Sequence, residues 1–104
     1  MFILTTVVNK KKEEYDIYIG RGSIWGNPFH IGKDGTREIV INKYKSYFYH
    51  KIHRDESFRL ETLKLKGKRL GCFCKPQACH GDVIKEYIES LSLPFAITSE
   101  RASR

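Results

Sequence analysis

Residues 68–83, KRLGCFCKPQACHGDV, join a predicted strand to a predicted helix, and this order decides the fold class. Lys68–Cys74 is short, follows a glycine and alternates in polarity, which predicts a strand. After a turn, Cys79 and His80 precede a predicted helix with apolar residues at helical spacing, which ends before Pro94. A strand that leads through a loop into a helix is typical of α/β domains.

Two further predicted strands and two predicted helices precede this segment. Phe2–Val8 is rich in β-branched residues and Tyr15–Ile19 alternates apolar with polar residues, so both are predicted strands. Gly20–Gly35 contains five glycines, which predicts a long irregular loop. Helices are predicted from Thr36 onward, where apolar residues recur at spacings of three and four, and over Asp55–Gly67.

The whole pattern predicts one small α/β domain over residues 1–94, followed by a C-terminal tail over residues 95–104. The expected architecture is a partly parallel sheet flanked by helices, in the three layers of a Rossmann-like fold. The length of 104 residues fits a single domain, and 40% hydrophobic residues place the chain outside the disordered class.

Cysteine usage and hydropathy predict a cytoplasmic protein. No apolar run approaches the roughly 18 residues of a membrane-spanning helix, which argues against a membrane partner. All three cysteines lie within residues 72–79, whereas a secreted disulfide scaffold spreads an even number along the chain. Clustered cysteines in a reducing compartment indicate metal or thiol chemistry.

A cluster of thiol and imidazole groups lies between the last predicted strand and the last predicted helix. Zinc prefers such ligands, arranged as a tetrahedron. Alternation along the strand puts two cysteines on one face, and the following turn brings a cysteine and a histidine back toward them. The candidate zinc ligands are Cys72, Cys74, Cys79 and His80.

Two other interpretations of this cluster stay open. Cys72 and Cys74 also suit a buried core as small apolar residues, with His80 capping the last helix. Alternatively, Cys79 is a reactive thiol, because the N-terminus of a helix lowers the pKa of a cysteine. In that case the candidate catalytic residues are Cys79, His80 and Asp82.

The glycine-rich loop has the chemistry of a phosphate site. Glycines let backbone N–H groups approach an anion closely, an arginine offers two directed hydrogen bonds, and a serine offers a hydroxyl. The candidate ligand-binding residues are Gly20, Arg21, Gly22, Ser23 and Asn27. The alternative is a structural loop in which Trp25 and Phe29 are buried against the core and the glycines make the turns.

The chain is basic, with 19 lysines and arginines against 12 acidic residues and a formal net charge of +7. Positive charge favours phosphate-bearing partners, including nucleic acid. The lysines are dispersed along the sequence, which equally suits an ordinary solvated surface.

In three stretches the sequence resembles a family of small phage and bacterial proteins classed as domain of unknown function 4326. The stretches are Tyr18–Phe29, Gly35–Glu38 and Gly71–Val83, and the resemblance runs from about residue 15 to residue 90. It implies that the glycine-rich loop and the cysteine cluster belong to one site, in a host cytoplasm if the chain is phage-encoded. No activity comes with the resemblance.

Two functional hypotheses follow. The first is a domain that binds a nucleotide-like or other phosphate-bearing small molecule, and that also acts on it if the site is catalytic. The alternative is a non-enzymatic, zinc-stabilised module that binds nucleic acid or a host protein. Because both unusual segments follow predicted strands, and ligands bind beyond the carboxyl ends of strands in α/β sheets, we expect the two segments to line one pocket.

Overall fold

Three parallel strands form the sheet of the computed structural model, which describes residues 4–75 and 77–91. The strands are β1 (Thr6–Asn9), β2 (Ile17–Tyr18) and β3 (Arg69–Cys72), in the spatial order β1-β3-β2. The central strand β3 pairs in parallel with both neighbours, and Leu70 lies opposite Val7 on one side and Ile17 on the other. The α/β class and the parallel sheet expected from the sequence are confirmed.

Side-chain caps define the two consecutive helices α1 (Arg37–Arg54) and α2 (Glu56–Leu63). The hydroxyl of Thr36 accepts a hydrogen bond from the first turn of α1. Asp55 ends α1 and begins α2, because its N–H donates to the Lys51 carbonyl while its carboxylate accepts from the N–H of Phe58. One residue therefore turns the chain between two helices.

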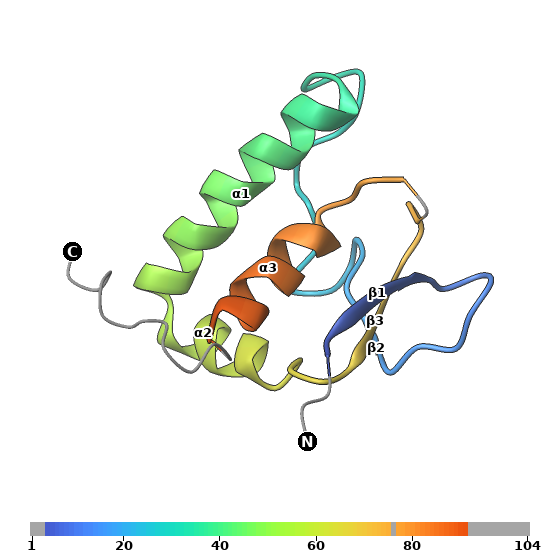
Figure 1. The fold of residues 1–104 in the computed structure, drawn as a ribbon. Coiled ribbons are helices and arrows are strands. Elements are labelled where there is room, and N and C mark those ends of the chain that lie inside the picture. Colours follow the sequence, from blue (N-terminus) through green and yellow to red (C-terminus); the bar gives the residue numbers. More distant parts are fainter. Residues whose placement is uncertain (1–3, 76, 92–104) are drawn as a thin grey trace.

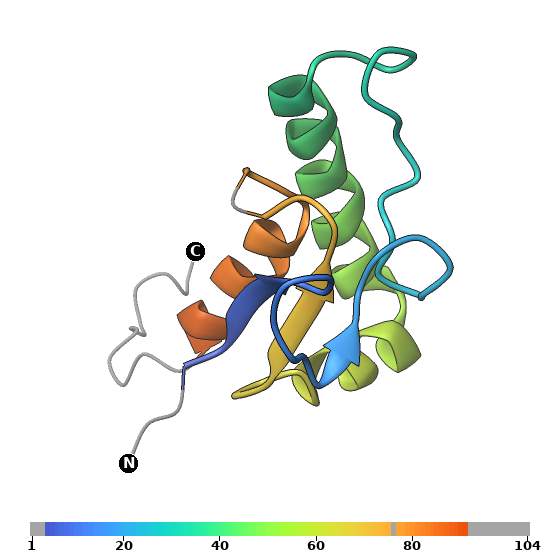
Figure 2. The same ribbon diagram turned by 90° about the vertical axis from the view of Figure 1, so that its right-hand side faces the viewer.

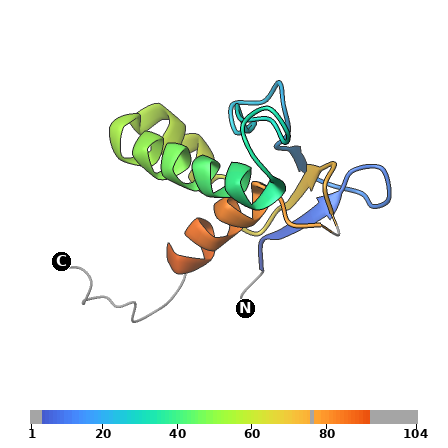
Figure 3. The ribbon, with the colours of Figure 1, turned by 90° about the horizontal axis from the view of Figure 1, so that it is seen from above.

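All three helices lie on the same side of the sheet. The third helix is α3 (Gly81–Leu91), which follows β3 and packs beside α1 (Figure 1). Figures 2 and 3 show the same separation of helices and strands from two other directions. On the opposite face Tyr15 lies against Gly71, where an added Cβ would come within 2.7 Å of its ring. The three-layer, Rossmann-like arrangement is therefore not confirmed in the described part of the chain.

The core lies between the helices and the sheet. Phe48 of α1 is fully buried at its centre and contacts four aromatic rings at centroid distances of 5.4–5.8 Å, those of Tyr44, Tyr49, Phe58 and Tyr87. Leu70 and Cys72, alternate residues of β3, complete the core from the sheet side. Burial of this apolar surface is the main force that holds helices and sheet together.

Several element bounds differ from those predicted. The predicted strand 2–8 begins only at Thr6 in the described residues, because the N–H of Thr5 donates to the Glu89 carboxylate and its hydroxyl accepts from Gly67. The predicted helix 55–67 ends at Leu63, since tight turns then bury Leu65. Residues 1–3 and the tail at 95–104 lie outside the described residues.

No helix within residues 4–75 and 77–91 has the length and apolarity needed to cross a membrane.

Candidate functional site

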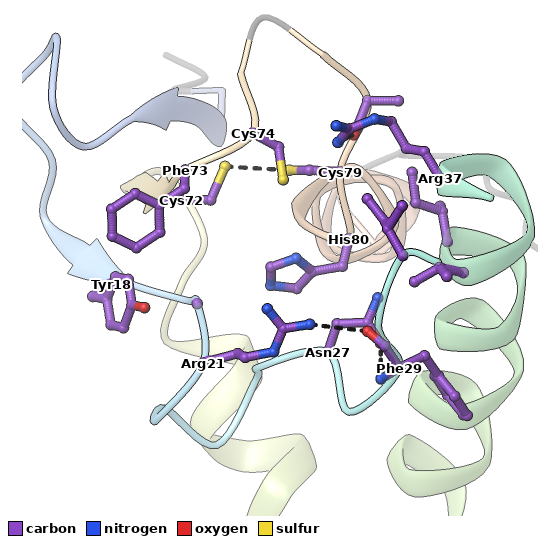
Figure 4. Close-up of a pocket in the computed structure, with 15 residues that line it drawn as sticks. Tyr18, Arg21, Asn27, Phe29, Arg37, Cys72, Phe73, Cys74, Cys79 and His80 are labelled. Atoms are coloured by element: carbon purple, nitrogen blue, oxygen red, sulfur yellow. Dashed lines mark hydrogen bonds between the residues drawn. The ribbon is translucent and has the colours of Figure 1, made fainter. Parts of the chain in front are cut away.

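A cavity of about 330 Å³ lies at the carboxyl ends of β2 and β3 (Figure 4). Three parts of the fold form it: the end of β2 with the glycine-rich loop, the first turns of α1, and the end of β3 with its connection to α3. We call it the sheet-edge cavity; it is lined by Tyr18, Gly20, Arg21, Asn27, Phe29, Ile31, Arg37, Val40, Ile41, Cys72, Phe73, Cys74, Ala78, Cys79 and His80. The pocket shared by the loop and the cysteine cluster, expected from the sequence, is therefore present.

Two arginines from different segments reach this cavity. Arg21 donates a hydrogen bond from Nη2 to the carbonyl oxygen of Phe29 at 3.0 Å, and Arg37 donates from Nη1 to that of Ala78 at 3.2 Å. A guanidinium carries further N–H groups beyond the one used in each of these bonds. Each arginine is thus anchored by the backbone and keeps donors for a bound anion.

The glycine-rich loop divides into residues that line the cavity and residues that shape the turn. Gly20, Arg21 and Asn27 belong to the lining. Gly22 has a φ of 97°, which favours glycine, and the Ser23 hydroxyl donates to the Gly20 carbonyl at 2.6 Å. Neither Gly22 nor Ser23 lines the cavity, so the lining gives no support to the ligand contacts predicted for these two residues.

Trp25 fixes this loop to the helices. Its indole N–H donates to the hydroxyl of Thr62 in α2 at 2.9 Å, and its carbonyl accepts from the hydroxyl of Tyr44 in α1 at 2.8 Å. Trp25 is 9% exposed, so the structural interpretation of this residue is confirmed. The same contacts hold the neighbouring Arg21 and Asn27 at the cavity.

The sulfur atoms of Cys72 and Cys79 lie 3.3 Å apart and are buried. The Cys79 sulfur also accepts the N–H of Gly81, while the carboxylate of Asp82 accepts the N–H of Cys79 at 3.1 Å. These two bonds tie Cys79 to the first two residues of α3, so the turn before the helix holds this thiol in place. Asp82 also pairs with Lys75 at 2.6 Å and does not line the cavity.

The two thiols share a hydrogen bond, and this bond shifts their pKa values in opposite directions. The bond from Cys79 lowers the pKa of Cys72 against the opposing effect of burial, and the N–H groups of Cys74 and Lys75 lower it further. The same bond and burial raise the pKa of Cys79. The pair of thiols, rather than Cys79 alone, is therefore the acidic group of the cluster, although the position of Cys79 before α3 favoured Cys79 as the reactive residue.

His80 is buried between the cavity and the core. Its Nε2 lies 2.7 Å from the carbonyl oxygen of Ile19, so this nitrogen carries the proton and donates. Burial lowers the pKa of His80 against the effect of this bond, and the nearby charge of Arg21 also lowers it. Figure 4 shows the ring pointing toward Arg21. The neutral imidazole keeps Nδ1 as an acceptor.

Acidification is expected to destabilise the folded protein through His80. Because its pKa is lower in the folded chain, the unfolded chain binds the proton more readily. The contribution to stability is complete above the unfolded pKa of about 6.5 and is lost as the pH falls toward the folded value. Urea unfolding between about pH 7.5 and 5.5 measures the loss. His80→Gln should show a smaller loss, and an equal loss in both proteins would contradict this assignment.

The zinc hypothesis gains no support from the geometry. Within residues 4–75 and 77–91 no group of three or more His, Cys, Asp or Glu side chains is arranged to hold a metal ion. Zinc at Cys72, Cys74, Cys79 and His80 stays a prediction. If this prediction is right, each purified chain contains one zinc ion. Chelation then lowers the melting temperature, because metal binding is linked to folding. Elemental analysis without zinc, with an unchanged melting temperature after chelation, would refute it.

Sequence reasoning did not single out Arg37, Tyr18 and Phe73 as cavity residues, and it gave Phe29 only a structural role. A cation in the first turn of a helix is electrostatically unfavourable, and this signal could have singled out Arg37. Phe73 alternates with Cys72 and Cys74, so the strand pattern places it on the face opposite to theirs, and in the structure it is 51% exposed.

Comparisons with known proteins agree with the resemblance. The family model described as "Domain of unknown function (DUF4326)" matches residues 5–90. The "Uncharacterized 12.4 kDa protein in nrdA-td intergenic region" of Enterobacteria phage T4 is 44% identical over 89 residues, 85% of this chain and 81% of the relative. "Uncharacterized protein R718" of Acanthamoeba polyphaga mimivirus is 34% identical over 87 residues, 66% of this chain and 63% of the relative. No solved structure matches.

Proposed function

The chain belongs to the DUF4326 family, and from this membership and the geometry of the sheet-edge cavity we propose that it binds a small nucleotide-like molecule through its phosphate. The observation that carries the proposal is the pair of backbone-anchored guanidinium groups, Arg21 and Arg37, in the lining of one cavity. Arg21 belongs to the glycine-rich loop and Arg37 to the first turn of α1, so folding brings two positive charges to the lining of one cavity.

Phosphate is the group that best fits the two arginines. A guanidinium makes two parallel hydrogen bonds to phosphate oxygens, which gives directed and charge-assisted contacts. His80, neutral because of its lowered pKa, adds no competing positive charge and offers Nδ1 to a ligand hydroxyl or N–H. Few carboxylates near the cavity repel a bound anion, since the carboxylate of Asp82 is already paired with Lys75 and accepts the N–H of Cys79.

The remaining lining suits a flat ring. Phe29, Phe73 and Tyr18 contribute aromatic surface, and Val40 and Ile41 of α1 contribute aliphatic surface. Binding sites for small molecules combine such apolar walls with a few convergent polar groups. We therefore assign the phosphate to the arginines and the base to the aromatic wall.

The groups available for chemistry on such a ligand are the thiols and the imidazole. Cys72, Cys79 and His80 line the cavity, whereas Asp82 reaches it only through its bond to Cys79. In this proposal Asp82 is a positioning residue rather than a catalytic one. The proposed setting is the cytoplasm, because free thiols persist in reducing compartments.

Isothermal titration calorimetry with a panel of ligands tests the proposal. Nucleoside monophosphates, diphosphates and triphosphates are compared with the matching unphosphorylated nucleosides and with inorganic phosphate. We expect saturable binding of at least one nucleotide, and much weaker binding of its nucleoside. Equal affinity for nucleotide and nucleoside, or no binding of any phosphate compound, would overturn it.

A further inference from the structure

Two lysines and three aromatic rings, of which Tyr15 and Phe73 are exposed and Tyr18 is half-buried, border the sheet-edge cavity. Lys10 Nζ lies 5.0 Å from the ring centres of both Tyr18 and Phe73 and 5.9 Å from that of Tyr15, and Lys11 Nζ lies 5.6 Å from that of Phe73. We call these five residues the lysine–aromatic patch. They come from the β1–β2 connection, the end of β2 and the residue after β3, so folding brings two adjacent lysines beside aromatic rings from three parts of the chain.

The patch is not explained by packing of the core. The helices cover one face of the sheet, and strand alternation turns Phe73 away from them while Cys72 points inward. Phe73 is 51% exposed and Tyr15 is 37% exposed, and Tyr18 meets Phe73 edge to face at 6.1 Å. A surface that combines exposed aromatic rings with neighbouring ammonium groups suits a partner that carries both flat rings and negative charge.

The patch is continuous with the cavity. Tyr18 and Phe73 belong to both, since their side chains also line the sheet-edge cavity, and Figure 4 shows both rings on the side of the cavity next to the strands. Tyr18 and Phe73 therefore connect the cavity to the lysines of the patch. The arrangement joins a half-open cavity of about 330 Å³ to an exposed, positively charged aromatic surface.

We propose that the protein binds single-stranded nucleic acid, with one nucleotide in the sheet-edge cavity and adjacent nucleotides on the lysine–aromatic patch. This inference rests on the proposed function, for which it names the substrate class as a nucleotide within a strand. Phe73 and Tyr15 stack on unpaired bases, and Lys10 and Lys11 contact the phosphates between them. A duplex is excluded from this mode, because its base faces are stacked and a single nucleotide does not fit the cavity without leaving the helix.

Fluorescence anisotropy with a labelled 12-nucleotide oligothymidylate tests the inference. We expect the oligonucleotide to bind the wild-type chain at least tenfold more tightly than thymidine monophosphate and than a duplex of the same length. The affinity should fall with rising salt, because the lysines release counterions from the phosphates. Phe73→Ala is expected to weaken oligonucleotide binding about fivefold or more, as does loss of one stacking platform elsewhere.

Matched variants separate the patch from general surface charge. Lys10→Ala is compared with Lys66→Ala, an exposed lysine before β3, and Phe73→Ala with Leu60→Ala, an exposed apolar residue of α2. Both controls should bind the oligonucleotide like the wild type. If each control loses as much affinity as its partner, the patch is not the binding surface. If thymidine monophosphate binds but the oligonucleotide binds no more tightly, this inference fails and the proposed function stands. If neither binds, this inference fails, and the proposed function fails only if no nucleotide of the calorimetry panel binds either.

Discussion

Replacing Arg21 by alanine is expected to weaken nucleotide binding about 10- to 100-fold, because a hydrogen bond to a charged group contributes roughly 1.5–3 kcal/mol. Arg21 is held toward the cavity by its bond to the Phe29 carbonyl, so its remaining donors meet the phosphate without further ordering. Arg21→Lys keeps the charge but loses the planar pair of donors, and an intermediate loss is expected.

Calorimetry of the three proteins against the same nucleotide measures these losses. Arg54→Ala is the matched control, because this arginine is exposed and lies at the far end of α1 from Arg37. Its affinity should equal that of the wild type. Equal losses for Arg21→Ala and Arg54→Ala would show that diffuse positive charge, rather than a directed contact, attracts the ligand.

Replacing Trp25 by alanine is expected to lower the free energy of unfolding by about 3–5 kcal/mol, since it empties a large buried site. Trp25→Phe keeps most of the ring but leaves the Thr62 hydroxyl without its donor, and a loss of about 1–2 kcal/mol is expected. The neighbouring Ile24 is 48% exposed, so Ile24→Ala should change stability by less than about 0.5 kcal/mol.

Urea unfolding followed by circular dichroism measures the Trp25 series. The loop that Trp25 fixes also carries Arg21 and Asn27, so Trp25→Ala should weaken nucleotide binding even at temperatures where it remains folded. A variant that is as stable as Ile24→Ala would contradict the role of Trp25 as the anchor of the loop.

The order of strands and helices was predictable because it depends on local signals. Thr36 and Asp55 are capping residues, and both begin helices in the structure. The lengths of the strands were not predictable, since pairing with β3 decides them. Leu60 and Leu63 contribute to the apolar pattern of α2, yet they are 49% and 40% exposed. Helical periodicity alone does not show which face of a helix packs against the core.

The shared location of loop and cluster was predictable from the general rule on parallel sheets, because Gly20, Arg21, Cys79 and His80 all follow strands. The cooperation of Cys72 with Cys79 was not. Alternation suggested that Cys72 and Cys74 act together, but the turn before α3 brings Cys79 to Cys72 and leaves Cys74 partly exposed. Such contacts depend on the path of a turn, which spacing does not fix.

The sheet order has a consequence for how the chain folds as it is synthesised. Within the described residues both outer strands pair only with β3, and Ile17 has no strand partner until Leu70, 53 residues later in the chain, has been synthesised. Until then α1 and α2 can pack locally while β1 and β2 have no ladder partner. Emergence of β3 from the ribosome completes two ladders and one edge of the cavity together. A nascent chain stalled at Gly67 is therefore a helical hairpin with unpaired strand edges, the form most exposed to aggregation and proteolysis.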